Sequence, residues 1–156
     1  MVHTIEDPLN SIKLIGFDGH FDYLHKLLKN NSFPNTMLIS GNKGLGKFTL
    51  INHFLNYIFD ENNYNLNEKI ISSSFIKYKK ILNKNFDNII FLKNSIDKKI
   101  KIEDIRKIKK ILSMSSLNMN KRFIIIDDIE LLNINSLNAL LKLIEEPTPN
   151  NYFILI

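Results

Sequence analysis

The segment GNKGLGK, residues 41–47, constrains the fold of this chain more than any other stretch, because it satisfies Gly-x-x-x-x-Gly-Lys in the required context. The apolar run MLIS precedes it and the periodic segment KFTLINHFLNYIF follows it, so the loop joins an expected strand to an expected helix. Glycines in such a loop let successive N–H groups point at phosphate oxygens. A Gly-rich turn without a ligand is the alternative. The residues expected to bind a nucleotide here are Gly41, Asn42, Lys43, Gly44, Leu45, Gly46, Lys47, Phe48 and Thr49.

The residue after Lys47 departs from the pattern. That position usually carries Ser or Thr, whose hydroxyl is a ligand of Mg²⁺, but here it is Phe48, which has no oxygen ligand. Thr49 comes one residue later, rotated by about 100° around the helix, so it cannot replace the missing hydroxyl, although it can help to hold the α-phosphate. We therefore expect the loop to hold ATP or ADP while positioning Mg²⁺ badly.

A second acidic motif lies in RFIIIDDIELL, where four apolar residues lead to Asp127. A strand-end Asp in this arrangement orients Mg²⁺, usually through water, so Asp127 is the predicted metal residue. Asp128 stands where nucleotide-hydrolysing proteins commonly place Glu, and it is one methylene shorter, which makes it a weak candidate for the catalytic base. Taken alone, the segment is equally explained as a strand with an acidic cap. Together with Phe48, it predicts slow or absent hydrolysis.

Strands and helices alternate along the chain. Helical spacing predicts helices over residues 47–59, 102–112 and 137–144, with weaker patterns over 20–29 and 69–82, and residues 59–68 indicate a polar loop. Leu137, Leu140, Leu141 and Ile144 are expected in the core. The runs expected to form buried strands are Thr36–Ser40, Asn88–Leu92, Phe123–Ile126 and Tyr152–Ile156. This order predicts an α/β fold with a mostly parallel sheet flanked by helices.

Composition excludes several classes of protein. The chain has no cysteine, so it has no disulfide and no Cys-ligated zinc. It shows no signal peptide and no apolar stretch of about 18 residues, so we expect a cytoplasmic protein without a membrane segment. The net charge of +5 comes almost entirely from Lys in a chain rich in Asn and Ile, so both a nucleic-acid surface and simple compositional bias remain open. Because the chain stops at a strand, we expect it to be part of a longer protein.

The segment NSLNALLKLIEEP, residues 135–147, follows the Asp127 strand and resembles the clamp-loader branch of the AAA+ ATPases. Two further segments also resemble this family, KLIGFDGHFDYLHKLLKNNSFPNTMLISG and IKIEDIRKIKKILSMSS. The resemblance therefore covers about residues 12–156. It implies a phosphate-loop AAA+ domain over residues 1–156, with Ile15 and Gly16 near an adenine. It further implies a five-stranded sheet with the phosphate-loop strand between the fourth and fifth strands. The fifth strand, the sensor, the arginine finger and later domains would lie beyond Ile156, leaving that strand as an exposed edge.

The resemblance further implies that the chain is part of the DNA polymerase III holoenzyme. In that holoenzyme, a pentameric loader places a ring-shaped sliding clamp on primed DNA. The partners would be the gamma/tau and delta subunits, with the clamp and the primer-template DNA reached through the complex. Phe48 and Asp128 favour the poorly catalytic delta-prime type over the gamma/tau motor. The four-Cys module of many relatives is missing between residues 60 and 86, so no zinc is expected.

Two other functions remain open from the sequence. The first is an active AAA+ ATPase motor of the gamma/tau type, and the second is a phosphate-loop kinase of small molecules, for which the Leu-rich helix ending at Glu145 has no obvious place. Asn138 is either a cross-subunit or nucleotide contact or a plain exposed residue. The lysines of KKIKIEDIRKIKK either touch DNA phosphates or form an ordinary solvated helix face.

Overall fold

The computed structural model describes residues 10–72, 88–94, 99–114, 121–146 and 148–156. The chain divides into two compact units. Unit 1 comprises Met1–Phe33 and Gly41–Phe86, and unit 2 comprises Pro34–Ser40 and Asp87–Ile156. The expectation of one domain over the whole chain stays a prediction.

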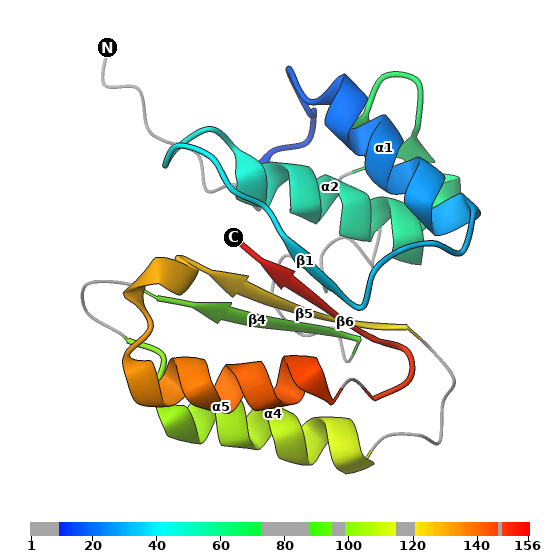
Figure 1. Cartoon of the computed structure of the whole chain (residues 1–156). Coiled ribbons are helices and arrows are strands. Elements are labelled where there is room, and N and C mark those ends of the chain that lie inside the picture. The colour runs from blue at the N-terminus through cyan, green and yellow to red at the C-terminus, as the bar shows by residue number, and fades with distance from the viewer. Residues whose placement is uncertain (1–9, 73–87, 95–98, 115–120, 147) are drawn as a thin grey trace. The chain divides into compact units, whose positions relative to one another are not determined.

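Unit 2 is built on a four-stranded parallel sheet with the strand order β1-β6-β5-β4 (Figure 1). Its strands are β1 (Thr36–Leu38), β4 (Ile89–Lys93), β5 (Arg122–Asp127) and β6 (Asn151–Leu155). The two central strands, β5 and β6, are almost completely buried, as expected of runs that are apolar on both faces. The predicted α/β fold with a mostly parallel sheet is therefore confirmed.

Two helices, α4 (Ile102–Met114) and α5 (Ile134–Glu145), lie side by side on one face of this sheet (Figure 1). Polar side chains cap both helices at their first turns. The Asp104 carboxylate accepts a hydrogen bond from the Lys101 N–H at 3.0 Å, and the Asn133 side chain accepts one from the Ser136 N–H at 2.8 Å. The core that they close contains Ile100, Ile105, Ile108, Leu112, Ile124, Ile126, Leu140, Leu143, Phe153 and Leu155.

The structure corrects the predicted core face of α5. Leu140 is fully buried and Leu143 is 8% exposed, whereas Leu141 is 44% exposed. Leu137 and Ile144 are only partly buried. Leu143 lies three residues after Leu140 on the same helix face, so the sheet selects this pair and turns Leu141 outward.

Strand β1 is an edge of the sheet among the described strands, paired only with β6. None of its residues is buried, and Leu38 is 63% exposed. The prediction of a buried strand at residues 36–40 is therefore wrong, while the prediction of an exposed edge is confirmed. An apolar run shows that a strand forms, but it does not show how many neighbours that strand has.

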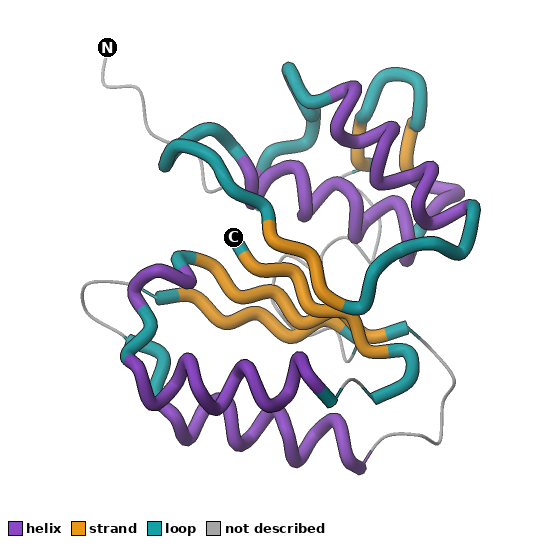
Figure 2. Tube along the Cα trace, in the orientation of Figure 1, coloured by secondary structure: helices purple, strands orange, loops and turns teal. Residues whose placement is uncertain are grey.

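Unit 1 contains α1 (Asp18–Lys29), α2 (Lys47–Phe59) and a two-stranded antiparallel sheet of β2 (Tyr64–Asn65) and β3 (Ile70–Ile71) (Figure 2). A short 3-10 helix, η2 (Glu61–Asn63), links α2 to β2. Aromatic rings fill the core of this unit. Phe21 stacks on Tyr64 with ring centroids 5.4 Å apart, and its ring meets Phe54 edge to face at 6.2 Å.

The weak helix predicted over residues 69–82 is wrong at its start. Ile70 and Ile71 form β3, which pairs with Tyr64 and Asn65 of β2. Residues 73–82 of that prediction lie outside the described residues. The polar segment 59–68, predicted as a loop, contributes η2 and β2. Pairing with a neighbouring strand overrides the local helical spacing here.

Candidate functional site

The loop from Gly41 to Lys47 has the backbone shape that its glycines predict. Gly41 has a φ of +148°, Gly44 of +86° and Gly46 of +91°, which are values that residues with a side chain rarely adopt. Gly46 directly precedes α2 and provides no side-chain cap. The first amide groups of an α-helix have no acceptor within the helix, so this end of α2 is suited to an anion.

The Lys47 side chain folds back over the loop. Its Nζ donates a hydrogen bond to the Gly41 carbonyl oxygen at 2.6 Å and lies 3.2 Å from the Asn42 carbonyl oxygen. The ammonium group is therefore held at the start of the loop by neutral acceptors. A phosphate is a stronger acceptor for an ammonium than a carbonyl is, so an anion in the loop would compete for the same group.

The Phe17 side chain lies beside the end of the loop. A Cβ atom placed on Gly46 would be 3.2 Å from Phe17 Cε2, so the phenyl ring lies close to the Gly46 backbone. Ile15 is 77% exposed and Gly16 has a φ of +77°. The placement of Ile15 and Gly16 near an adenine stays a prediction, and the Ile15 side chain is exposed.

Phe48 and Thr49 occupy the first turn of α2, and both are partly buried. The Thr49 hydroxyl oxygen lies 4.0 Å from the position that a Cβ atom on Gly46 would take, so it faces the end of the loop. Phe48 offers no oxygen at the position after Lys47. The donor set of the loop therefore suits phosphate but does not fit Mg²⁺, which requires hard oxygen ligands.

Asp127, at the end of β5 in unit 2, has partners for both carboxylate oxygens. Its side chain is 12% exposed, and Oδ2 lies 3.4 Å from Lys93 Nζ at the end of β4. Oδ1 accepts a hydrogen bond from the Asp128 N–H at 3.1 Å. The predicted metal residue is thus in place at a strand end, but a lysine already provides its counter-charge.

Asp128 turns the chain after β5. It has a φ of +54° and precedes the 3-10 helix η3 (Ile129–Leu131). Its carbonyl oxygen accepts a hydrogen bond from Asn94 Nδ2 at 3.0 Å, and Asn94 Oδ1 accepts one from the Ile100 N–H at 2.8 Å. This buried amide ties the end of β5 to the segment that leads into α4. The role of Asp128 as a base stays a prediction.

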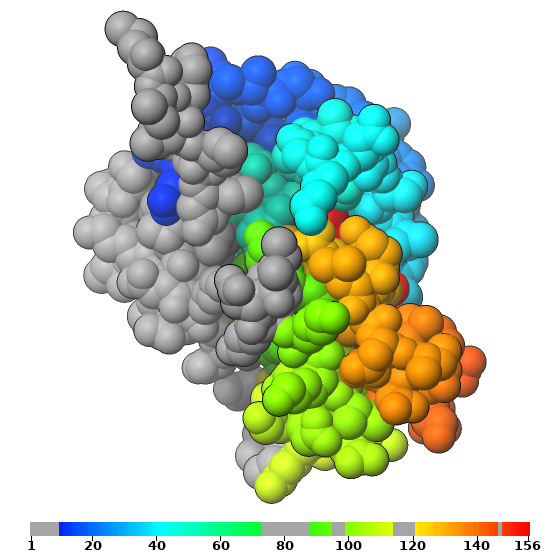
Figure 3. All heavy atoms as spheres, turned by 90° about the vertical axis from the view of Figure 1, so that its left-hand side faces the viewer, coloured from blue at the N-terminus to red at the C-terminus, as the bar shows by residue number. Residues whose placement is uncertain are grey.

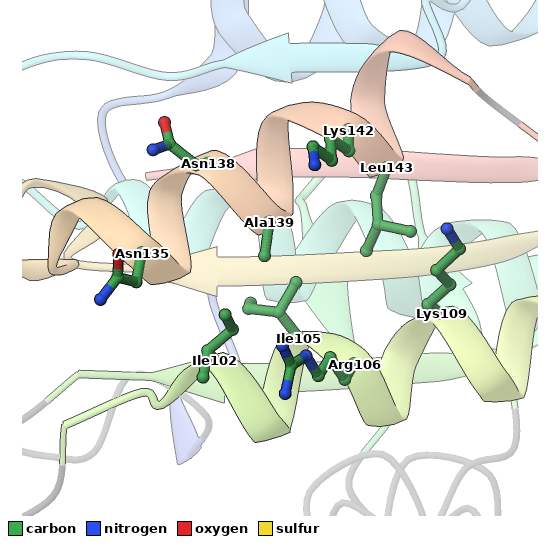
Figure 4. A pocket seen from close by; sticks show the side chains of 9 residues that line it. All are labelled: Ile102, Ile105, Arg106, Lys109, Asn135, Asn138, Ala139, Lys142 and Leu143. Carbon is green, nitrogen blue, oxygen red and sulfur yellow. The ribbon is translucent and has the colours of Figure 1, made fainter.

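A groove of about 370 Å³ runs between α4 and α5 (Figure 4). Figure 3 shows the surfaces of these helices, yellow-green and orange, lying against each other. The groove has an apolar floor and a basic rim, and no acidic side chain lines it among the described residues. Its lining residues are Ile102, Ile105, Arg106, Lys109, Asn135, Asn138, Ala139, Lys142 and Leu143. Arg106, Lys109 and Lys142 make the rim of the groove positively charged.

None of the helices in the described ranges is long and apolar enough to cross a membrane. Over the same ranges, no group of three or more His, Cys, Asp or Glu side chains is arranged to hold a metal ion.

A parallel sheet flanked by helices is the architecture expected of an AAA+ protein of the clamp-loader class. A family model described as DNA polymerase III, delta subunit matches residues 18–156, and the chain belongs to that family. This match confirms the resemblance to a clamp-loader family.

One solved structure is similar to this chain over much of its length. It is a DNA polymerase III gamma subunit-related protein from Thermotoga maritima, with 22% sequence identity and a TM-score of 0.49. The match covers 86% of this chain and 38% of that protein, so this chain spans well under half of that protein's length. No curated protein sequence matches the chain significantly.

Sequence reasoning missed three residues that shape these sites, namely Phe17, Lys93 and Asn94. Lys93 and Asn94 directly follow a predicted strand, and ligand sites in parallel sheets lie at the carboxyl ends of strands. That rule would have identified them. Phe17 gave no such signal, because its contact with Gly46 joins segments far apart in the chain.

Proposed function

We propose that the chain acts as a delta-prime-like, non-motor subunit of the DNA polymerase III clamp loader. In this role it holds ATP or ADP at the Gly41–Lys47 loop and hydrolyses it slowly or not at all. Its partners are the gamma/tau and delta subunits, and through them the sliding clamp and primer-template DNA. The assembly works in the cytoplasm.

One observation carries the proposal: the loop retains its left-handed glycines and Lys47, while the next residue is Phe48. The glycines and the lysine serve phosphate binding, whereas the residue that would ligate Mg²⁺ has no oxygen. Mg²⁺ neutralises charge as a phosphoryl group is transferred, and the residues here do not fit it. Binding without efficient turnover follows, which distinguishes this chain from a gamma/tau motor.

A titration of the full-length protein with a fluorescent ADP analogue tests nucleotide binding. Lys47→Ala removes the ammonium that serves phosphate and should weaken binding about 100-fold, or ~2.7 kcal/mol. Lys26→Ala, at an exposed position of α1, is the control and should leave binding unchanged. Brisk ATP hydrolysis by the unmodified protein, lost in Lys47→Ala, would instead identify a motor.

Assembly is tested by mixing the full-length protein with the gamma/tau and delta subunits of the same organism. Size-exclusion chromatography with mass detection should then show a complex that contains one copy of this chain. A protein that elutes alone, or as a ring of its own copies, would contradict the clamp-loader role.

The groove between α4 and α5 favours a second proposal, in which this chain also contacts the DNA backbone directly within the assembled loader. Arg106 and Lys109 come from α4 and Lys142 from α5, so the cations converge on one groove from two helices (Figure 4). Neutralising a lysine that contacts a phosphate lowers the salt dependence of DNA binding by about one unit of slope. In the assembled loader, Lys109→Gln should do so, and Lys110→Gln, an exposed neighbour outside the groove, should not. Equal slopes for both variants would place the DNA elsewhere.

A further inference from the structure

We propose that Lys93 is a built-in counter-cation that excludes Mg²⁺ from the Asp127 carboxylate. Lys93 is then the residue that determines the metal preference of this strand end.

The sheet register fixes the pair. Lys93 and Asp127 are the last residues of the neighbouring parallel strands β4 and β5, and they lie opposite each other in the ladder. Side chains at opposed positions of a parallel pair extend to the same face of the sheet, so this register brings the ammonium next to the carboxylate. The distance from Nζ to Oδ2 is 3.4 Å. The contact thus depends on the strands themselves rather than on a loop.

Both oxygens of the Asp127 carboxylate already have partners, so they are poorly available as metal ligands. Oδ1 of Asp127 accepts the Asp128 N–H at 3.1 Å, and Oδ2 lies beside the ammonium. An ammonium has three donors and no acceptor, so it cannot act as a ligand. It also repels a divalent cation that approaches the Asp127 carboxylate.

The Lys93 side chain is far more exposed than that of Asp127, which makes Lys93 the residue to substitute. The Lys93 side chain is 56% exposed, so its charge can be removed without opening a cavity in the core. A partly exposed ion pair contributes little to stability. Substitutions at Lys93 should therefore change the metal preference of a folded protein.

Mn²⁺ is the probe, because it occupies Mg²⁺-type oxygen sites and its binding is measured directly by electron paramagnetic resonance. Titrations use the full-length protein without nucleotide. The unmodified protein should show no Mn²⁺ site that depends on Asp127. Lys93→Met keeps the length of the side chain without the charge, and it should bind Mn²⁺ at least about tenfold more tightly.

Three further variants make the result specific. Lys93→Arg retains the charge and should behave like the unmodified protein, and Lys99→Met, an exposed lysine, should have no effect. Lys93→Met combined with Asp127→Asn should lose the new site again. An Asp127-dependent Mn²⁺ site in the unmodified protein, or no gain in Lys93→Met, overturns the inference.

Discussion

The two units of the chain bury different chemistry. Unit 1 has an aromatic core with polar groups inside it, and its helix α2 buries Asn52, His53 and Asn56 among apolar neighbours. Unit 2 has a core of Ile, Leu and Phe between its sheet and two helices. Its buried polar residues Asn94, Asp127, Ser136 and Asn151 stand at or beside the ends of strands and helices.

This difference predicts which changes most reduce the stability of each unit. A buried polar group is costly unless it is hydrogen-bonded, and a titratable one makes stability depend on pH. Unit 1 places a histidine of this kind in the helix that begins at the Gly41–Lys47 loop. In unit 2, the neutral amide of Asn94 holds the turn after β5. We therefore expect acid to act first on unit 1 and loss of an amide to act most on unit 2.

The largest expected effect concerns His53, which is fully buried. Its Nε2 lies 3.0 Å from the Ser11 carbonyl oxygen, which can only accept, so Nε2 donates and Nδ1 accepts from the Tyr64 hydroxyl at 3.2 Å. Burial lowers the pKa of His53 from 6.5 to about 4. The unfolded chain therefore binds the proton first, and stability falls as pH drops from 6.5 to 4, by about 3 kcal/mol in total.

Urea unfolding between pH 4 and pH 7, followed by circular dichroism, measures this loss. The contribution of His53 should be complete above pH 6.5 and lost by about pH 4. His53→Gln should flatten the pH dependence, and a substitution at the exposed His20 should not. Burial also lowers the pKa of His25, so a smaller dependence in the same direction remains in His53→Gln. Identical pH profiles for His53→Gln and the unmodified protein would break the comparison of the units.

The second prediction compares one buried asparagine from each unit. In unit 2, Asn94 is bonded to the backbone of Asp128 and of Ile100, so Asn94→Ala leaves a buried N–H without its acceptor. We expect a loss of about 2 kcal/mol in the free energy of unfolding. In unit 1, the Asn56 side chain bonds only Asn52 of its own helix among the residues that the structure describes, so its removal leaves no comparable group there unsatisfied.

Asn56→Ala should therefore cost less than about 1 kcal/mol, since Ala also has the highest helix propensity. Among the described residues, Asn56 Oδ1 has no hydrogen-bond partner at all, which favours the same result. Urea unfolding of the two variants at neutral pH measures both values. Equal losses would mean that the amides of the two units play the same structural role.

The sequence was sufficient to predict the parallel sheet and its helices. Runs of Ile and Phe locate β4, β5 and β6 to within a residue or two, and the spacing of Ile105, Ile108 and Leu112 predicts the buried face of α4. The sequence predicted the buried face of α5 less well. Apolar residues stand at 140, 141, 143 and 144, so more than one helix face is apolar enough to be buried. Only the position of the sheet decides between Leu141 and Leu143.

Within the candidate sites, the loop was predictable and the partners of Asp127 were not. Gly-x-x-x-x-Gly-Lys is a local pattern, and its glycines adopt the expected positive φ values. The contact between Lys93 and Asp127 depends on the register of two strands that are distant in sequence. Periodicity assigns each strand separately and does not give that register.

The smallest expected effect concerns the shape of the loop in unit 1. Gly46→Ala would hold a side chain at a φ of +91° and place its Cβ atom 3.2 Å from Phe17 Cε2, so we expect a loss of about 1 to 2 kcal/mol. Gly19 lies in α1, where a Cβ atom would meet nothing within 4 Å. Gly19→Ala should therefore gain up to about 1 kcal/mol from helix propensity. Urea unfolding gives both values, and a Gly46→Ala variant as stable as Gly19→Ala would show that the loop does not need its left-handed turn.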